Sequence, residues 1–121
     1  MAHEATCVLV VDDNLEYAQN IAEILQLIGG CTTEVFTTAE DALPVALDPR
    51  ITLVVTDYRL PGMNGVELVR RVLSERDDIK AVVISAYADD SAVLAARQLG
   101  ATFLNKPVDF TALGRLARAQ S

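Results

Sequence analysis

Three short runs of consecutive apolar residues constrain the fold of this chain more than any other feature. Residues 7–11, 53–55 and 81–84 are unbroken and mostly β-branched. Strands that are covered on both faces lack polar alternation, so such runs are typical of the buried strands of a parallel sheet. Residues 35–36 and 102–104 predict two further, weaker strands.

Segments with helical periodicity separate these strands. In the first, apolar residues recur at helical spacing, with Asn14 as the expected N-cap and Gly29 and Gly30 as the stop signal. The other four predicted helices cover residues 38–47, 65–75, 90–99 and 109–119. Pro44 lies inside the second helix, which should be kinked or broken there. Five alternating strands and helices predict right-handed βαβ units and a parallel sheet wrapped by helices.

Composition places this chain of 121 residues among globular proteins, with 51% apolar and 22% charged residues. We expect one domain over residues 1–121, because neither repeats nor linker-like stretches divide it. No apolar run approaches the roughly 18–20 residues that span a bilayer, and the first residues do not resemble a signal peptide. We therefore expect a cytoplasmic protein without membrane contact. Cys7 and Cys31 are expected to stay reduced, and the single histidine, His3, excludes a multi-histidine zinc site or a Ser-His-Asp triad.

The charge is acidic and unevenly spread. The net charge is −7, and residues 1–49 contain nine acidic residues but neither Lys nor Arg. A chain without a basic stripe is poorly suited to gripping phosphate backbones, so direct binding of nucleic acid is not expected.

Polar residues follow four of the predicted strands at their carboxyl ends. In an open parallel sheet, ligands bind beyond this edge, where the strand order reverses. We therefore expect three carboxylates, one hydroxyl and one ammonium to meet there. They belong to Asp12, Asp13, Asp57, Ser85 and Lys106.

This combination of groups suits phosphoryl transfer. Crowded carboxylates repel one another unless a cation joins them, and ligand sets made only of oxygen favour Mg²⁺ or Mn²⁺. An incoming phosphoryl group would meet the metal, the Lys106 ammonium and the Ser85 hydroxyl. Asp57 could itself be the acceptor and form an aspartyl phosphate.

The sequence resembles the receiver domains of two-component response regulators over essentially its whole length. The motifs that carry this resemblance are residues 8–14, 54–65, 83–86 and 103–107, in that order. Within the second motif, Pro61 and Gly65 lie four and eight residues after Asp57. The resemblance implies a flavodoxin-like (βα)5 fold with five parallel strands in the order 2-1-3-4-5, flanked by five helices.

The resemblance also implies a role for each site residue. Asp57 would be the phosphoacceptor, while Asp13 would bind Mg²⁺ directly and Asp12 mostly through water. The backbone carbonyl of Arg59 would be a further metal ligand. Lys106 would contact the phosphoryl group and Ser85 would donate a hydrogen bond to it. Phe103 would be the aromatic switch residue, Arg59 and Tyr87 would flank the site, and the Lys106–Pro107 peptide bond would be cis.

The implied function is a phosphorylation-dependent signalling switch. Its phosphoryl group would come from the phosphohistidine of a sensor histidine kinase or a histidine phosphotransfer protein. The domain would catalyse its own phosphorylation and dephosphorylation without an external substrate. Phosphorylation would change the face formed by the fourth helix, fifth strand and fifth helix, which would bind a downstream protein or domain or form a phosphorylation-dependent dimer. The polar residues along the first helix either dock the donor or are simply solvated; these are Glu16, Gln19, Asn20, Glu23 and Gln26.

Two other classes of function compete with this interpretation. A phosphatase of the haloacid-dehalogenase type also forms an aspartyl phosphate, but it needs Asp at positions i and i+2, whereas here Asn14 follows an adjacent pair. A pseudo-receiver interaction module would typically lack the acceptor, the acidic pair or the lysine, and all are present. The chain could be a stand-alone regulator or one receiver of a larger response regulator or hybrid kinase.

Overall fold

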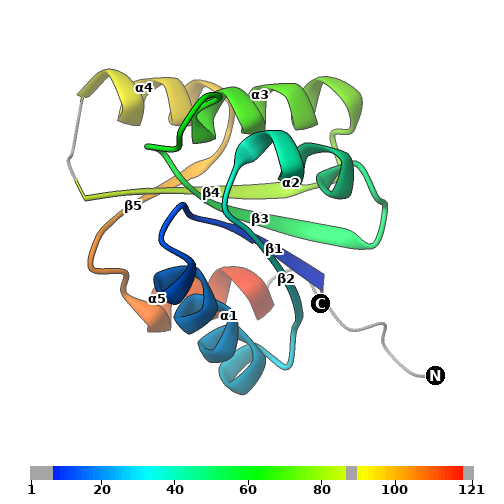
Figure 1. The fold of residues 1–121 in the computed structure, drawn as a ribbon, viewed down its shortest axis with the longest axis vertical. Coiled ribbons are helices and arrows are strands. Elements are labelled where there is room, and N and C mark those ends of the chain that lie inside the picture. Colours follow the sequence, from blue (N-terminus) through cyan, green and yellow to red (C-terminus); the bar gives the residue numbers. More distant parts are fainter. Residues whose placement is uncertain (1–6, 87–89, 119–121) are drawn as a thin grey trace.

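The computed structural model describes residues 7–86 and 90–118 and shows a five-stranded parallel sheet (Figure 1). The strand order is β2-β1-β3-β4-β5, which confirms the predicted order. All five predicted strands are present, and the last four are longer than the sequence indicated. The strands are β1 (Cys7–Val11), β2 (Thr32–Phe36), β3 (Ile51–Asp57), β4 (Lys80–Ser85) and β5 (Thr102–Asn105).

Helices cover both faces of the sheet. In Figure 1, α1 and α5 lie below the sheet and α2, α3 and α4 lie above it. The five helices are α1 (Leu15–Gly29), α2 (Ala39–Ala46), α3 (Gly65–Glu75), α4 (Asp90–Gln98) and α5 (Phe110–Arg118). Within the described ranges, no helix combines the length and the apolar character needed to cross a membrane.

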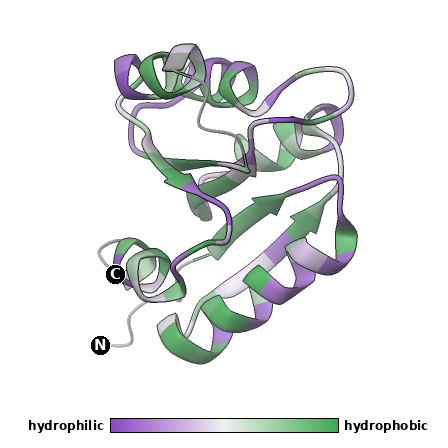
Figure 2. Cartoon of the chain, turned by 90° about the vertical axis from the view of Figure 1, so that its left-hand side faces the viewer, coloured by the Kyte–Doolittle hydropathy of each residue, from purple (hydrophilic) through white to green (hydrophobic). Residues whose placement is uncertain are grey.

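The continuous apolar runs are buried because each strand packs against helices on both of its faces. Along β1, Val8 and Val10 pack against α1 and α5, whereas Leu9 and Val11 pack against α2 and α3. This alternation follows from the two-residue period of a strand. Figure 2 accordingly shows largely apolar strands, while each helix carries both apolar and polar surface.

The two cysteines are free, as predicted. Cys31 is buried in the apolar cluster between the sheet and helices α1 and α5, and Cys7 packs against the cluster on the opposite face of the sheet. Burial raises the pKa of the Cys31 thiol, as does the nearby Cys7 to a smaller extent. A thiol in this setting is inert rather than reactive.

Helix termini agree with the capping signals, but the prediction for Pro44 was partly wrong. Asn14 accepts a hydrogen bond from the Tyr17 N–H at 3.1 Å, and Gly30 ends α1 with φ at 63°. The predicted break at Pro44 is absent, since α2 continues to Ala46. Pro44 lies in the last turn of α2, so its missing N–H removes only one hydrogen bond, close to the end of the helix. Three fully buried alanines hold α2 on the sheet; they are Ala39, Ala42 and Ala46.

Candidate functional site

Three carboxylates converge at the carboxyl edge of the sheet, on the left of Figure 1. Val11 of β1 pairs with Thr56 of β3, so the residues that follow them, Asp12 and Asp57, become neighbours. Carboxylate oxygens of Asp12, Asp13 and Asp57 lie within 4.8 Å of one another. Asp12 and Asp57 are buried, and Asp13 is exposed to solvent. This is the group of acidic residues that the strand ends predicted.

Lys106 supplies the positive charge of the site. Its backbone N–H donates to the Ser85 carbonyl at 2.9 Å, which joins the ends of β4 and β5. Its Nζ lies 2.9 Å from Asp12 Oδ2 and 3.4 Å from Asp57 Oδ2. The Lys106–Pro107 peptide bond is cis, as the resemblance implied. Lys106 therefore bridges two of the three carboxylates.

Ser85 and Phe103 occupy the strands beside Asp57. Asp57 pairs with Ile84, and Ser85 follows as the last residue of β4, 1% exposed. Phe103 pairs with Val83 and is half-buried against the cluster under α3 and α4. The structure thus brings Ser85 to the acidic edge, whereas Phe103 lies further back along the sheet. Tyr87, the other predicted flanking residue, lies outside the described residues.

The electrostatics of the site favour the arrival of positive charge. The pKa of Asp57 is raised, first because burial disfavours its charged form and second because Asp12 is close. Lys106 and the Arg59 backbone N–H oppose this rise. Burial alone would lower the pKa of Lys106, but its hydrogen bond to Asp12 and the charges of Asp57 and Asp12 raise it. One ammonium therefore only partly balances three carboxylates.

The donor set fits a hard divalent cation. Asp12, Asp13 and Asp57 offer only oxygen ligands, which favour Mg²⁺ or Mn²⁺ over zinc or copper. The exposure of Asp13 leaves the site open on one side, where water or phosphate oxygens can complete the coordination of Mg²⁺. The residues that are present thus match the cation that the sequence predicted.

The loop after Asp57 is held at both of its ends. The Tyr58 N–H donates to the Ile84 carbonyl at 2.7 Å, and the Gly65 N–H donates to the Tyr58 carbonyl at 2.9 Å. A Cβ on Gly65 would lie 2.2 Å from the Asp57 carbonyl oxygen, so only glycine allows α3 to begin this close to Asp57. These contacts fix the backbone around Arg59, whose side chain is exposed.

Two residues beside the site were not predicted from the sequence. Glu40 of α2 accepts a hydrogen bond from the Met63 N–H at 2.8 Å, which ties the loop after Asp57 to a second helix. Tyr17 of α1 contacts Lys106 and the backbone of Val108. Tyr17 could have been found from its position, because it lies about one helical turn after the acidic pair and so close to the carboxyl edge of the sheet. Glu40 gave no comparable signal.

The outward face of α1 is polar next to this site. All five polar residues that the sequence places along this helix are exposed. Leu15, at the start of the same helix, is 48% exposed and also lies next to the acidic pair. The α1 surface is therefore accessible beside Asp13. The five polar residues are Glu16, Gln19, Asn20, Glu23 and Gln26.

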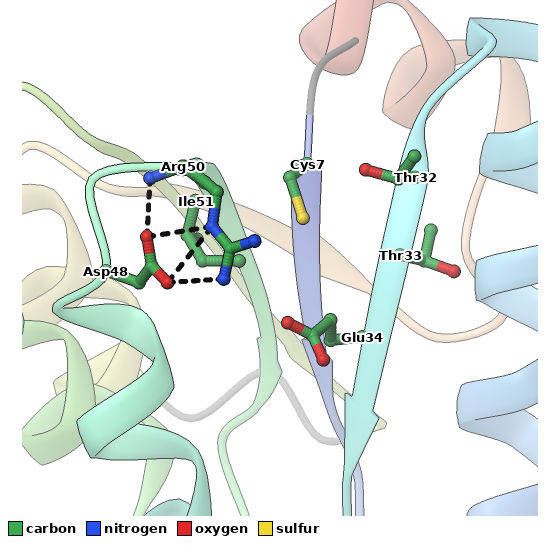
Figure 3. A pocket seen from close by; sticks show the side chains of 7 residues that line it. All are labelled: Cys7, Thr32, Thr33, Glu34, Asp48, Arg50 and Ile51. Atoms are coloured by element: carbon green, nitrogen blue, oxygen red, sulfur yellow. Dashed lines mark hydrogen bonds and ion pairs between the residues drawn. The ribbon is translucent and has the colours of Figure 1, made fainter.

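A separate hollow of about 420 Å³ lies at the opposite edge of the sheet (Figure 3). Two of its charged residues pair with each other, because the Arg50 guanidinium binds Asp48 through both carboxylate oxygens. The Asp12, Asp13 and Asp57 group is, within the described part of the chain, the set of acidic residues close enough to hold a metal. We therefore place the functional site at the carboxyl edge. The hollow at the opposite edge is lined by Cys7, Thr32, Thr33, Glu34, Asp48, Arg50 and Ile51.

Comparisons with known proteins agree on one family. A family model described as the response regulator receiver domain matches residues 8–118. A response regulator receiver protein from Anaeromyxobacter sp. (strain Fw109-5) is 40% identical over 101 residues, which is 83% of this chain and 42% of that protein. The chemotaxis protein CheY of Treponema pallidum (strain Nichols) is 34% identical and covers 84% of this chain, which in turn covers 73% of that protein.

Solved structures show the same fold. The crystal structure of a response regulator receiver protein from Pseudomonas putida matches with a TM-score of 0.87 and 30% sequence identity. The match covers 98% of this chain and 99% of that chain. Several curated relatives are longer, and this chain spans 23–51% of their length.

Proposed function

This chain belongs to the response regulator receiver domain family, and we propose that Asp57 is its phosphoacceptor in a two-component pathway. Receiver domains are signalling domains, so the product of the reaction is the phosphorylated protein itself. The observation that carries the proposal is the convergence of Asp12, Asp13, Asp57 and Lys106 at one edge of the sheet. The donor would be the phosphohistidine of a sensor histidine kinase or a histidine phosphotransfer protein.

The transfer step follows from the chemistry of these groups. A carboxylate oxygen of Asp57 forms a bond to phosphorus while the phosphorus–nitrogen bond of the donor breaks, and the electron pair of that bond stays on the donor imidazole. Lys106 Nζ is close enough to Asp57 to pair with the negative oxygens of the transferred group. The Ser85 hydroxyl, at the end of the neighbouring strand, would donate to one of those oxygens. The product is an aspartyl phosphate.

Asp12 and Asp13, with the backbone carbonyl of Arg59, would hold Mg²⁺ or Mn²⁺ next to Asp57. When bound, the cation would supply positive charge that offsets the negative charge of the carboxylates and of the phosphoryl oxygens. The Glu40–Met63 hydrogen bond supports this arrangement, because it restrains the loop that carries the Arg59 carbonyl. The same groups would also let the domain catalyse its own dephosphorylation by water.

The signal would leave the site through Ser85 and Phe103. If Ser85 moves inward to bind the phosphoryl group, space opens beside α4 for the half-buried Phe103 ring. Leu94 of α4 is 57% exposed and supports a binding role for this surface. The face formed by α4, β5 and α5 would then bind a downstream protein or domain, or a second copy of the domain.

Phosphorylation by a small donor tests the acceptor. With Mg²⁺ and acetyl phosphate, the wild type should gain one acid-stable, base-labile phosphoryl group, and Asp57→Asn should gain none. Asp77→Asn is a matched control, because Asp77 is exposed and remote from the acidic edge. Labelling that persists in Asp57→Asn places the acceptor elsewhere. A wild type that takes no label acts as a pseudo-receiver, and turnover of a generic phosphate ester indicates a phosphatase.

Hydrogen exchange tests the route of the signal. Beryllofluoride, which stands in for the phosphoryl group, should alter exchange across residues 86–105 in the wild type. Ser85→Ala should still accept the phosphoryl group but transmit a weaker change to this segment. A response confined to the acidic edge, or an undiminished response in Ser85→Ala, contradicts this route.

A further inference from the structure

Tyr17 makes two contacts with the segment that carries Lys106. The Lys106 Nζ lies 4.6 Å from the centre of the Tyr17 ring, within the range of a cation–π interaction. The Tyr17 hydroxyl accepts a hydrogen bond from the Val108 N–H at 3.4 Å. One side chain of α1 therefore touches both the head group of Lys106 and the backbone two residues further along.

We propose that Tyr17 is a positioning residue that holds the Lys106 ammonium over Asp57. The inference rests on the proposed function, in which Lys106 pairs with the transferred phosphoryl group. Lysine has a flexible four-carbon stem and loses considerable rotamer freedom when its ammonium is fixed. A preformed contact on the ring reduces the number of positions that the ammonium samples before the donor arrives.

The carboxylates alone do not provide this constraint throughout the reaction. Lys106 is hydrogen-bonded to Asp12 and Asp57, which are the groups that exchange partners when a cation or a phosphoryl group arrives. The contact with the Tyr17 ring does not depend on either carboxylate. It can therefore persist while the other interactions of Lys106 change.

The backbone around Tyr17 is itself anchored to the site. Asp12 Oδ1 accepts the Asn14 N–H at 2.9 Å, and Asn14 Oδ1 accepts the Tyr17 N–H at 3.1 Å. A short chain of contacts thus runs from Asp12 through Asn14 and Tyr17 to Lys106. The same contacts therefore fix both the start of α1 and the position of the Lys106 ammonium.

Tyr17 is also half-buried against the core between the sheet and helices α1 and α5. Its effect on core packing must therefore be separated from its effect on the position of Lys106. Phe110 packs against the same cluster from α5 and is a matched control for the loss of an aromatic ring. Tyr17→Leu removes the ring and the hydroxyl, whereas Tyr17→Phe removes only the hydroxyl. Phe110→Leu removes a ring without touching the contacts of Lys106.

Two measurements test the proposal. The first is the NMR shift of the Lys106 ε-methylene protons, which the Tyr17 ring current should displace in the wild type and in Tyr17→Phe but not in Tyr17→Leu. The second is the rate of Asp57-dependent phosphorylation by acetyl phosphate. Tyr17→Leu should slow it roughly two- to tenfold, the range expected for loss of one cation–π contact. Tyr17→Phe should fall between Tyr17→Leu and the wild type, and Phe110→Leu should stay near the wild type.

The results distinguish this inference from the proposed function. Labelling that survives Asp57→Asn overturns the proposed function, whereas the ring-current shift is read in unphosphorylated protein and is unaffected by that outcome. The inference is wrong if the wild type shows no displaced Lys106 signals, which can be measured even where Tyr17→Leu does not fold. It is also wrong if Tyr17→Leu slows phosphorylation no more than Phe110→Leu.

Discussion

The two edges of the sheet carry similar residues in opposite electrostatic states. At the carboxyl edge, burial and the neighbouring Asp12 raise the pKa of Asp57. At the amino edge, hydrogen bonds from Arg50 lower the pKa of Asp48 to about 2. The first carboxylate is held where its charge is unfavourable, and the second is held where its charge is stabilised. The domain thus concentrates its unbalanced charge at the edge where a ligand and a phosphoryl group would bind.

Arginines account for the balance at the amino edge. The Arg76 side chain, only 10% exposed, donates to the backbone carbonyls of Ala46 at 3.2 Å and Asp48 at 2.8 Å, and also to Asp78 at 2.8 Å. It therefore joins the end of α2 to the segment after α3. Arg50 binds the Asp48 carboxylate (Figure 3), whereas Arg76 binds the Asp48 backbone carbonyl. At this edge, paired charges stabilise the fold, whereas at the carboxyl edge burial and the neighbouring Asp12 disfavour the charge of Asp57.

The largest expected effect is that of metal on the carboxyl edge. Mg²⁺ at about 100 times its dissociation constant should stabilise the wild type by roughly 2.7 kcal/mol, because it binds the three carboxylates only where folding has brought them together. Asp13→Asn should lose most of this gain, while Asp78→Asn at the amino edge should keep it. Thermal melts with and without millimolar Mg²⁺ measure both. A wild-type melting temperature that is indifferent to Mg²⁺ would remove the contrast between the edges.

Arg76→Ala should be the most damaging change at the amino edge. It leaves the carbonyls at the end of α2 without a buried donor, and hydrogen bonds to charged groups contribute about 1.5–3 kcal/mol. We expect a loss of about 2 kcal/mol in chemical denaturation and an unchanged affinity for Mg²⁺. Arg71→Ala is the control, because that side chain is 55% exposed and forms a surface ion pair with Glu67. Equal losses in the two variants would show that Arg76 has no special structural role.

Asp57→Asn should stabilise the metal-free protein. The pKa of Asp57 is raised, so its contribution to stability is complete below the unfolded value near 3.8 and is lost as the pH rises through the folded value. The neutral amide avoids this loss, and we expect a gain in the range of stabilising single substitutions, about 0.5–2 kcal/mol, at neutral pH. Melting temperatures from pH 4 to 8 should show the gain shrinking toward the acidic end. A variant that is less stable than the wild type at neutral pH would mean that pairing with Lys106 outweighs burial.

Most of the fold and the charged residues of the site were predictable from local sequence. The three central strands, β1, β3 and β4, each contain an unbroken apolar run, and in a parallel sheet the residue after such a strand lies at the carboxyl edge. With this rule, the linear sequence alone placed Asp12, Asp57, Ser85 and Lys106 at the carboxyl edge of the sheet, where the structure has them. The caps at Asn14 and Gly30 were predictable for the same reason, because they depend only on residues a few positions away.

The remaining features depend on tertiary neighbours. Tyr17, Glu40 and Arg76 act through backbone groups that are 23 or more residues away in sequence, which no local pattern encodes. Pro44 was predicted to kink or break α2, but the packed alanines of that helix outweigh a single lost hydrogen bond in its last turn. Local sequence therefore predicts the helices and strands, whereas the side chains that support the site depend on contacts between these elements.

The smallest expected effect comes from Asp48→Asn at the amino edge. Side-chain and backbone hydrogen bonds from Arg50 lower the pKa of Asp48 to about 2 from a reference of 3.8. Such a group stabilises the fold fully above pH 3.8, and this contribution is lost as the pH falls through about 2. Asp48→Asn should therefore lower the melting temperature slightly at neutral pH, with a difference that diminishes between pH 4 and 2, opposite in sign to that of Asp57→Asn. Because the Arg50 side chain is 79% exposed, added salt should weaken the effect. If the two variants shift the melting temperature in the same direction at neutral pH, the two edges do not differ in the way their charges indicate.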